Sequence, residues 1–227
     1  MRRVYWFLWL VIIVGYANAS VLYGDSATFK PKPIFGREAK VIAFILDNNH
    51  YRKIQFNDSL SSAILDAYVL NLDANKSFFL DSDIKSFEKY RTMLDDETRN
   101  ESVQPAYDIY TVFRKRFKER MDYVTSVLVK QNFTYTENEF YETNREKEPW
   151  CKTVAEINDL WRRSIKSQAL SLKLAGKKDD EISSTLQARY DRFVKSMNQY
   201  TTEDVFSLYM NTVTEAYDPH TNYFSPR

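Results

Sequence analysis

The fold of this chain is decided by residues 105–128, which read PAYDIYTVFRKRFKERMDYVTSVL. Proline at position 105 suits a first helical turn, where its missing amide needs no partner. Charged side chains alternate with a regular apolar face, whose members recur three or four positions apart: Tyr110, Phe113, Phe117, Met121, Val124 and Leu128. That spacing predicts a long amphipathic α-helix packed against a core.

The same helical spacing extends upstream as far as Arg37. A second predicted helix begins at Asp58, a good N-cap, and a third is capped by Asp81 or Ser82 and runs to Leu94. The earliest predicted helix is marked by Val41, Ile42, Phe44 and Ile45. Residues 20–37 lack a sustained period and contain two prolines and two glycines, so we interpret them as a flexible leader.

Downstream, Thr153 and Glu156 form a capping-box pattern at the start of another helix. Gly176 sits where a helix commonly ends with a left-handed glycine. Two further helices are predicted from Asp179 and from Thr201. The last of them must end near residue 217, because the residue before a proline avoids the α region.

These patterns predict an all-α fold, a single irregular bundle of about seven helices over residues 38–217. The core is expected to be rich in aromatic side chains, with one long loop at about 131–150. The sequence has only four glycines. Phosphate-binding loops and nucleophile elbows need glycines at fixed positions, and none of those motifs is present.

The amino terminus predicts a secretory signal peptide over residues 1–19. Arg2 and Arg3 precede an apolar run, Val4 to Val14, which is shorter than the roughly 20 residues that span a bilayer. Ala17-Asn18-Ala19 fits a signal peptidase site, and we expect cleavage after Ala19. An uncleaved membrane anchor is the alternative.

Charge and residue usage exclude several classes of function. The net charge of +1 gives no excess of basic residues to attract nucleic acid. His50 and His220 lie outside any metal-binding spacing, and no cofactor or metal is expected. Cys151 is the single cysteine and is expected to be a buried thiol. No serine, cysteine or threonine has a recognisable activating context, so the sequence predicts no catalytic residue.

The last ten residues carry the candidate interdomain residues Asp218, Pro219, Tyr223 and Phe224. Asp218 can accept hydrogen bonds from nearby amides and Pro219 fixes φ, so the pair predicts a turn out of the preceding helix. Tyr223 and Phe224 are large apolar residues just beyond that turn. They either pack on this domain's own core or anchor against a further domain.

Several segments strongly resemble the amino-terminal helical region of tail-specific proteases, the periplasmic C-terminal-processing peptidases. The most specific is the closing Asp218-Pro219-His220-Thr221-Asn222-Tyr223-Phe224-Ser225-Pro226-Arg227, which looks like the turn that leads into the PDZ domain in that family. The others are Glu148-Pro149-Trp150, Asp159-Leu160-Trp161, Leu170-Ser171-Leu172-Lys173-Leu174 and Glu203-Asp204-Val205-Phe206-Ser207-Leu208. Upstream, Leu72-Asp73 and the segment from Phe79 to Ile84 also fit.

This resemblance implies a non-catalytic helical module of a Ser/Lys-dyad serine endopeptidase, located in the periplasm. The dyad would lie beyond Arg227, so residues 1–227 should be inactive alone, and 218–227 would be a linker toward the PDZ domain. The implied partners are PDZ and protease domains, protein substrates and a lipoprotein adaptor. A free-standing periplasmic adaptor or binding protein that reuses the module is the alternative.

Overall fold

The computed structural model describes residues 29–225. These residues form eight α-helices and two short 3-10 turns, with no β-sheet. The all-α prediction is confirmed. The helices are α1 (Pro33–Asn49), α2 (Asp58–Leu72), α3 (Asp81–Phe87), α4 (Leu94–Arg99), α5 (Gln104–Ser126), α6 (Val154–Leu174), α7 (Asp179–Asn198) and α8 (Thr202–Tyr217). The predicted signal peptide and the first half of the predicted leader, residues 20–28, lie outside the described residues.

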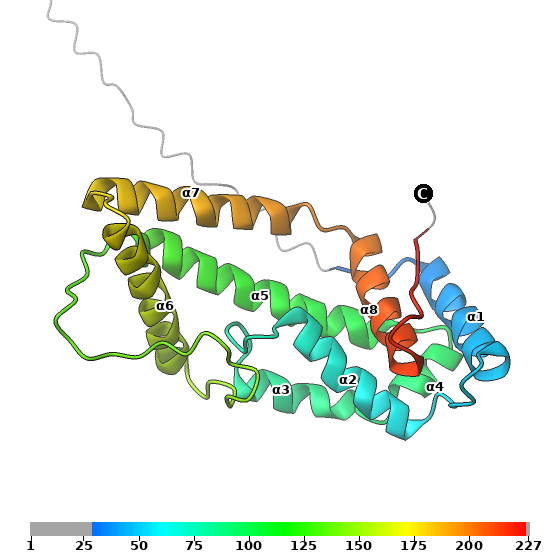
Figure 1. The fold of residues 1–227 in the computed structure, drawn as a ribbon. Helices are drawn as coiled ribbons and strands as arrows, with labels where there is room; N and C mark the ends of the chain where they lie inside the picture. The colour runs from blue at the N-terminus through cyan, green and yellow to red at the C-terminus, as the bar shows by residue number, and fades with distance from the viewer. Residues whose placement is uncertain (1–28, 226–227) are drawn as a thin grey trace, which may run out of the picture.

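Helix α5 runs the length of the molecule and contacts helices at both of its ends (Figure 1). Near its carboxyl end it packs against α6 and α7. Near its amino end lie α1, α2, α4 and α8, which pack on one another. All six residues of the predicted apolar face of α5 are buried, so the segment that decides the fold lies at its centre.

Helix α1 begins at Pro33, earlier than the predicted domain boundary at residue 38. Pro33 occupies the first turn, where a proline costs no hydrogen bond. The last five residues of the predicted leader are therefore helical, and Phe35 and Gly36 among them are buried. Sequence period alone missed this start because the two buried residues are adjacent rather than spaced along a face.

The predicted helix from 81 to 94 is shorter than expected and a separate helix follows it, which is why the described residues form eight helices rather than about seven. Helix α3 ends at Phe87, a 3-10 turn covers Glu88–Tyr90, and α4 begins at Leu94. Contacts with α2 override the local period. Ser61 donates to the Asp95 carboxylate over 2.8 Å and accepts from the Asp95 amide over 3.0 Å, which fixes the start of α4.

Two predicted N-caps are displaced by one residue. Asn57, rather than Asp58, caps α2 by accepting a hydrogen bond from the Leu60 amide over 3.1 Å. Leu80 is the N-cap residue of α3, and the Asp83 carboxylate accepts from the Leu80 amide over 2.9 Å. The predicted caps, Asp58 and Asp81, lie inside the first turns, where their charge favours the helix amino ends.

The other predicted helix ends are observed. Thr153 caps α6 by accepting from the Glu156 amide, while the Glu156 carboxylate accepts from the Lys152 amide over 2.7 Å. Gly176 follows α6 with φ of +86°, a conformation that favours glycine. Helix α8 has a full capping box between Thr201 and Asp204, and it ends at Tyr217.

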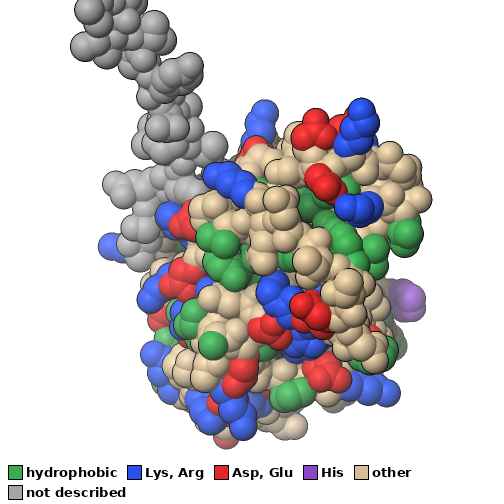
Figure 2. All heavy atoms as spheres, turned by 90° about the vertical axis from the view of Figure 1, so that its left-hand side faces the viewer, with side chains coloured by type: hydrophobic (Ala, Val, Ile, Leu, Met, Phe, Trp, Pro, Cys, Tyr) green, Lys and Arg blue, Asp and Glu red, His purple; other side chains and the backbone are tan. Residues whose placement is uncertain are grey.

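The long segment between α5 and α6 is a loop beyond the turn Leu128–Lys130, as predicted for 131–150. Ion pairs tie it to α6. The Lys166 ammonium lies 2.7 Å from the carboxylates of both Glu137 and Glu139. Further along the loop, Lys76 donates to the carbonyls of Glu146 and Glu148. The end of the molecule that holds this loop and the α6–α7 turn shows intermixed basic and acidic side chains (Figure 2).

A buried carboxylate organises the connector between α2 and α3. Asp73 is 3% exposed, and it accepts hydrogen bonds from the amides of Ser77, Phe78 and Phe79 at 2.8, 2.8 and 2.9 Å. Desolvation raises the pKa of this carboxyl, while the three amides act in the opposite direction. The Leu72-Asp73 segment and the apolar connector behind it therefore form one hydrogen-bonded unit.

Candidate functional site

The candidate interdomain residues lie where the chain leaves α8. Asp218 is the C-cap residue of that helix and is buried. Its Oδ1 accepts from the His220 amide over 2.8 Å, and its carbonyl accepts from the Thr221 amide over 2.9 Å. Pro219 is the second residue of the resulting four-residue turn, a position that suits its fixed φ.

Three consecutive residues after α1 hold this turn in place. The Tyr51 hydroxyl donates to Asp218 Oδ2, and the Arg52 guanidinium donates to the Tyr217 carbonyl over 2.6 Å. His50 Nε2 lies 3.1 Å from the Thr221 hydroxyl oxygen. We call His50, Tyr51 and Arg52 the 50–52 segment. It fixes the direction in which the chain leaves the helical domain.

A second set of contacts anchors the 50–52 segment to the core. Asp47 Oδ1 accepts from the Tyr217 hydroxyl over 2.7 Å and from the Phe56 amide over 2.8 Å. Tyr217 and Phe56 are both buried. The end of α1, the loop that follows it and the end of α8 are therefore a single hydrogen-bonded structure.

The two aromatic candidates have different surroundings. Tyr223 is half-buried, its ring meets Phe206 edge-on at 5.4 Å, and its amide donates to Asn211 Oδ1 over 2.9 Å. Phe224 is 85% exposed. Tyr223 therefore packs on this domain's own core, as one alternative expects, and Phe224 does not.

Sequence reasoning missed the 50–52 segment. Its residues are separated from their partners by more than 160 positions, and they lie between helices, where no apolar period exists. The sequence contains two histidines, yet nothing in it indicates that His50 contacts the turn that contains His220. Among residues 29–225, no group of three or more histidine, cysteine or carboxylate side chains could hold a metal ion.

The turn should be stable to pH over a wide range. The Tyr51 hydroxyl and the His220 amide lower the pKa of Asp218, and the hydrogen bond to Asp218 raises the pKa of Tyr51. A lowered carboxyl pKa contributes stability above its unfolded value of about 3.9, and this is lost as pH falls through the lowered pKa. A raised tyrosine pKa contributes stability below about 10, which is lost as pH rises through the raised value.

Tyr51→Phe should therefore raise the pKa of Asp218 toward its ordinary value, because the largest cause of the lowering is removed. Carboxyl carbon shifts measured by NMR across an acid titration report this pKa directly. Tyr200→Phe is the matched control, since Tyr200 stacks on Tyr110, away from the turn. An Asp218 titration that is the same in Tyr51→Phe and in the parent would contradict the assigned hydrogen bond.

No helix within residues 29–225 has the length and apolarity that crossing a bilayer requires.

The single cysteine, Cys151, is a buried free thiol, and desolvation raises its pKa. A buried thiol with a raised pKa is a poor nucleophile. At the carboxyl end of α8, the features that could serve a function are the fixed turn at Asp218 and Pro219 and the exposed Phe224 just beyond it.

Two comparisons with known proteins agree with each other. The family model described as "Tail specific protease N-terminal domain" matches residues 42–227. A protein of Haemophilus influenzae named tail-specific protease is 34% identical over 235 aligned positions. That alignment covers 100% of this chain but 33% of the relative, so the chain spans about one third of the relative's length.

Proposed function

The chain belongs to the tail-specific protease family, and from this premise we propose that it is the non-catalytic N-terminal helical module of a C-terminal-processing serine endopeptidase. The observation that carries the proposal is the family match over residues 42–227, which spans nearly all of the described helices. Peptide-bond hydrolysis by a Ser/Lys dyad would belong to the part of a longer protein that follows residue 227.

The module's role in this proposal is to pack on PDZ and protease domains and to contribute to docking of substrates or of a lipoprotein adaptor. Two features support it. The turn at Asp218 and Pro219 is fixed by the 50–52 segment, so a following domain would be held in a defined direction. Phe224 is available beyond that turn as an apolar contact.

The proposed location is the periplasm, after export directed by residues 1–19. The support is the pattern of Arg2 and Arg3, a short apolar run and Ala17-Asn18-Ala19. The chain has one cysteine and so cannot form an internal disulfide, which is compatible with an oxidising compartment.

The test compares residues 1–227 with the longer product of the same reading frame, both recovered from the periplasm. We expect the longer protein to cleave an unfolded substrate with an apolar carboxyl terminus, and both mature proteins to begin at Ser20 by intact mass. Residues 1–227 alone should give no turnover above buffer.

Turnover by residues 1–227 that is lost on changing one serine or lysine within them would overturn the assignment as non-catalytic. A reading frame that ends at residue 227 in the gene would instead favour the free-standing adaptor. Retention of residues 1–19 in the mature protein would indicate a membrane anchor.

A further inference from the structure

Helix α1 presents apolar side chains on two opposite faces. Its inner face packs into the domain through Phe35, Ala39, Ala43 and Leu46. Its outer face carries Val41, Phe44 and Ile45, which are 56%, 64% and 51% exposed. Ile34, seven residues before Val41 and so about two turns away, is 42% exposed. We call Ile34, Val41, Phe44 and Ile45 the outer α1 face. Clustered exposure of this kind commonly marks an interaction surface.

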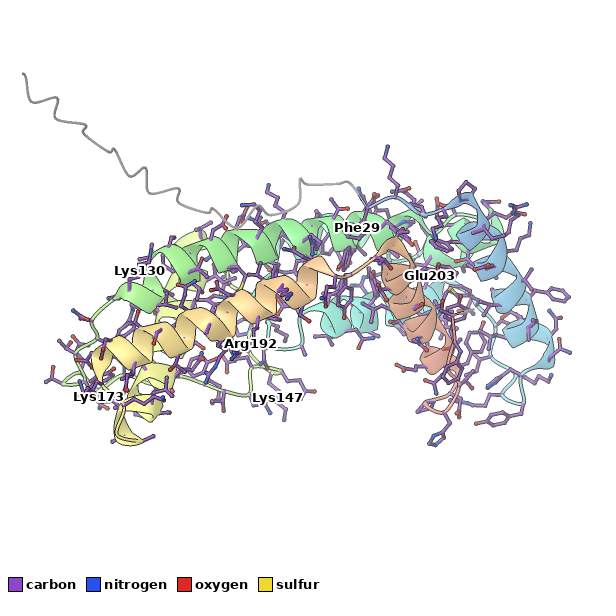
Figure 3. All side chains as sticks on the ribbon, turned by 90° about the horizontal axis from the view of Figure 1, so that it is seen from above. Phe29, Lys130, Lys147, Lys173, Arg192 and Glu203 are labelled. Atoms are coloured by element: carbon purple, nitrogen blue, oxygen red, sulfur yellow. The ribbon has the colours of Figure 1, made fainter. Side chains whose placement is uncertain are left out.

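The carboxyl-terminal segment lies beside this helix. Glu203, at the start of α8, accepts a hydrogen bond from Ser225 over 2.9 Å and pairs with Lys32, next to the first residue of α1. The Tyr223 ring meets Phe206, which stacks on Phe35 of α1 with ring centroids 4.5 Å apart. Burial, and then the charge of the Glu38 carboxylate on α1, raise the pKa of the Tyr223 hydroxyl. Figure 1 shows the segment running alongside α1, and Figure 3 marks Glu203 at this end of the molecule.

Position along the helix joins the two features. Val41 and Ile45 lie three and seven residues after Glu38, so they share its side of α1. Phe224 is next to Tyr223 and points away from the domain's own core, at 85% exposure. Val41 and Ile45 of the outer α1 face, together with Phe224, therefore border the path by which the chain leaves the domain.

The fixed exit turn indicates what would cover this surface. Because the 50–52 segment holds residues 217–221, any continuation of the chain starts beside α1 rather than sampling all directions. The relative from Haemophilus influenzae is about three times as long as this chain. A segment that directly follows needs little linker to reach the outer α1 face, which gives it a high effective concentration there.

Charge on the face disfavours a lipid surface as the occupant. Arg37 is exposed and lies one turn before Val41 and about two turns before Phe44, within the apolar stripe. Asn48 is exposed one turn after Phe44. A membrane-bound helix keeps such groups on the side opposite its apolar stripe, whereas a protein surface can supply partners for them.

We propose that the outer α1 face, together with Phe224, is the docking surface for the domain that follows residue 227. This inference rests on the proposed function, because it needs a longer protein. It goes further in naming the residues that meet the next domain, and in assigning α1 both to this domain's core and to the interface.

Thiol labelling tests the proposal in the longer protein. Phe44→Cys places a thiol on the outer α1 face, and Val154→Cys is the matched control at the start of α6, where the parent residue is 49% exposed. Cys151 is buried, so the parent provides the background rate. We expect maleimide to label position 44 at least tenfold more slowly in the longer protein than in residues 1–227, with position 154 unchanged. Ile45→Cys repeats the measurement if Phe44→Cys fails to fold.

Each other outcome overturns the proposal. Equal rates at position 44 in the two proteins mean that the face is uncovered, and equal protection at both positions means that the effect is not specific to α1. Protection within residues 1–227 that rises with protein concentration identifies a second copy as the occupant, and protection by anionic lipid vesicles identifies a membrane. Peptidase activity, assayed in parallel, distinguishes failure of the docking proposal from failure of the proposed function. If the longer protein is active and position 44 is freely labelled, the docking surface is wrong and the proposed function still stands.

Discussion

Trp161→Ala lowers the free energy of unfolding by about 3–5 kcal/mol, the usual cost of truncating a buried tryptophan. Trp161 is 8% exposed and packs against Phe78 and Tyr190, with ring centroids 5.5 and 6.2 Å apart. Its Nε1 donates to the Ser77 carbonyl over 2.7 Å. The substitution removes the ring from between two elements and leaves the part-buried Ser77 carbonyl without its partner, so a hydrogen-bond cost adds to the cavity cost.

Urea unfolding followed by far-ultraviolet circular dichroism measures this loss. Leu174→Ala is the matched control, because Leu174 is on the same helix and is 80% exposed. Its effect should be within about 0.5 kcal/mol of zero. If the two variants unfold at the same denaturant concentration, Trp161 is not a core residue, whatever its position in the apolar period.

Much of the fold follows from period and capping. The α5 stripe, the helix start at Thr201 and the helix end at Gly176 each depend on local physics, and each is found as predicted. The break between α3 and α4 is not predicted, because it is set by a long-range contact rather than by local sequence. It depends on Ser61, which lies 34 residues from Asp95, and no local pattern encodes that contact.

The candidate site shows the same division. A turn at Asp218 and Pro219 follows from the two residues themselves, since an aspartate side chain accepts from nearby amides and proline fixes φ. The contacts by which the 50–52 segment holds the turn are visible only in the three-dimensional structure, because the partners are far apart in the sequence. One signal for α1 was present in the sequence and unused: its small residues Gly36, Ala39 and Ala43 lie on one side, and small residues mark the face where backbones approach closely.

Gly36→Ala should destabilise the domain more than any ordinary glycine-to-alanine change. A Cβ at position 36 would lie 1.7 Å from the Glu101 carbonyl oxygen and 2.4 Å from its carbon. These are backbone atoms that no side-chain rotation can move away. Glu101 itself has φ of 60°, so the turn after α4 already holds a conformation uncommon for a residue other than glycine.

The expected cost is about 3 kcal/mol, at the upper end for overpacking, because either α1 or the turn after α4 must shift. Gly176→Ala is the matched control: it makes the same chemical change at a left-handed position with nothing within 4 Å of the added Cβ. There the cost is about 1 kcal/mol and comes from backbone conformation alone. Denaturation of the two variants side by side separates steric from conformational effects, and equal losses would contradict the close approach of α1 to Glu101.

Gly36→Ala should also affect the proposed interface, because the element that it displaces is α1. Helix α1 meets α4 and α8, and a Cβ at position 36 acts on its first turns, beside Glu38 and the exit segment. Amide exchange in Gly36→Ala should therefore rise along α1 while the centre of α5 stays protected. In the longer protein the same change should increase thiol labelling at position 44, because the outer α1 face can meet a following domain only while the inner face is seated. If amide exchange along α1 is fast but labelling at position 44 is still slow, then the outer α1 face meets the following domain without needing the packing of Gly36 against Glu101.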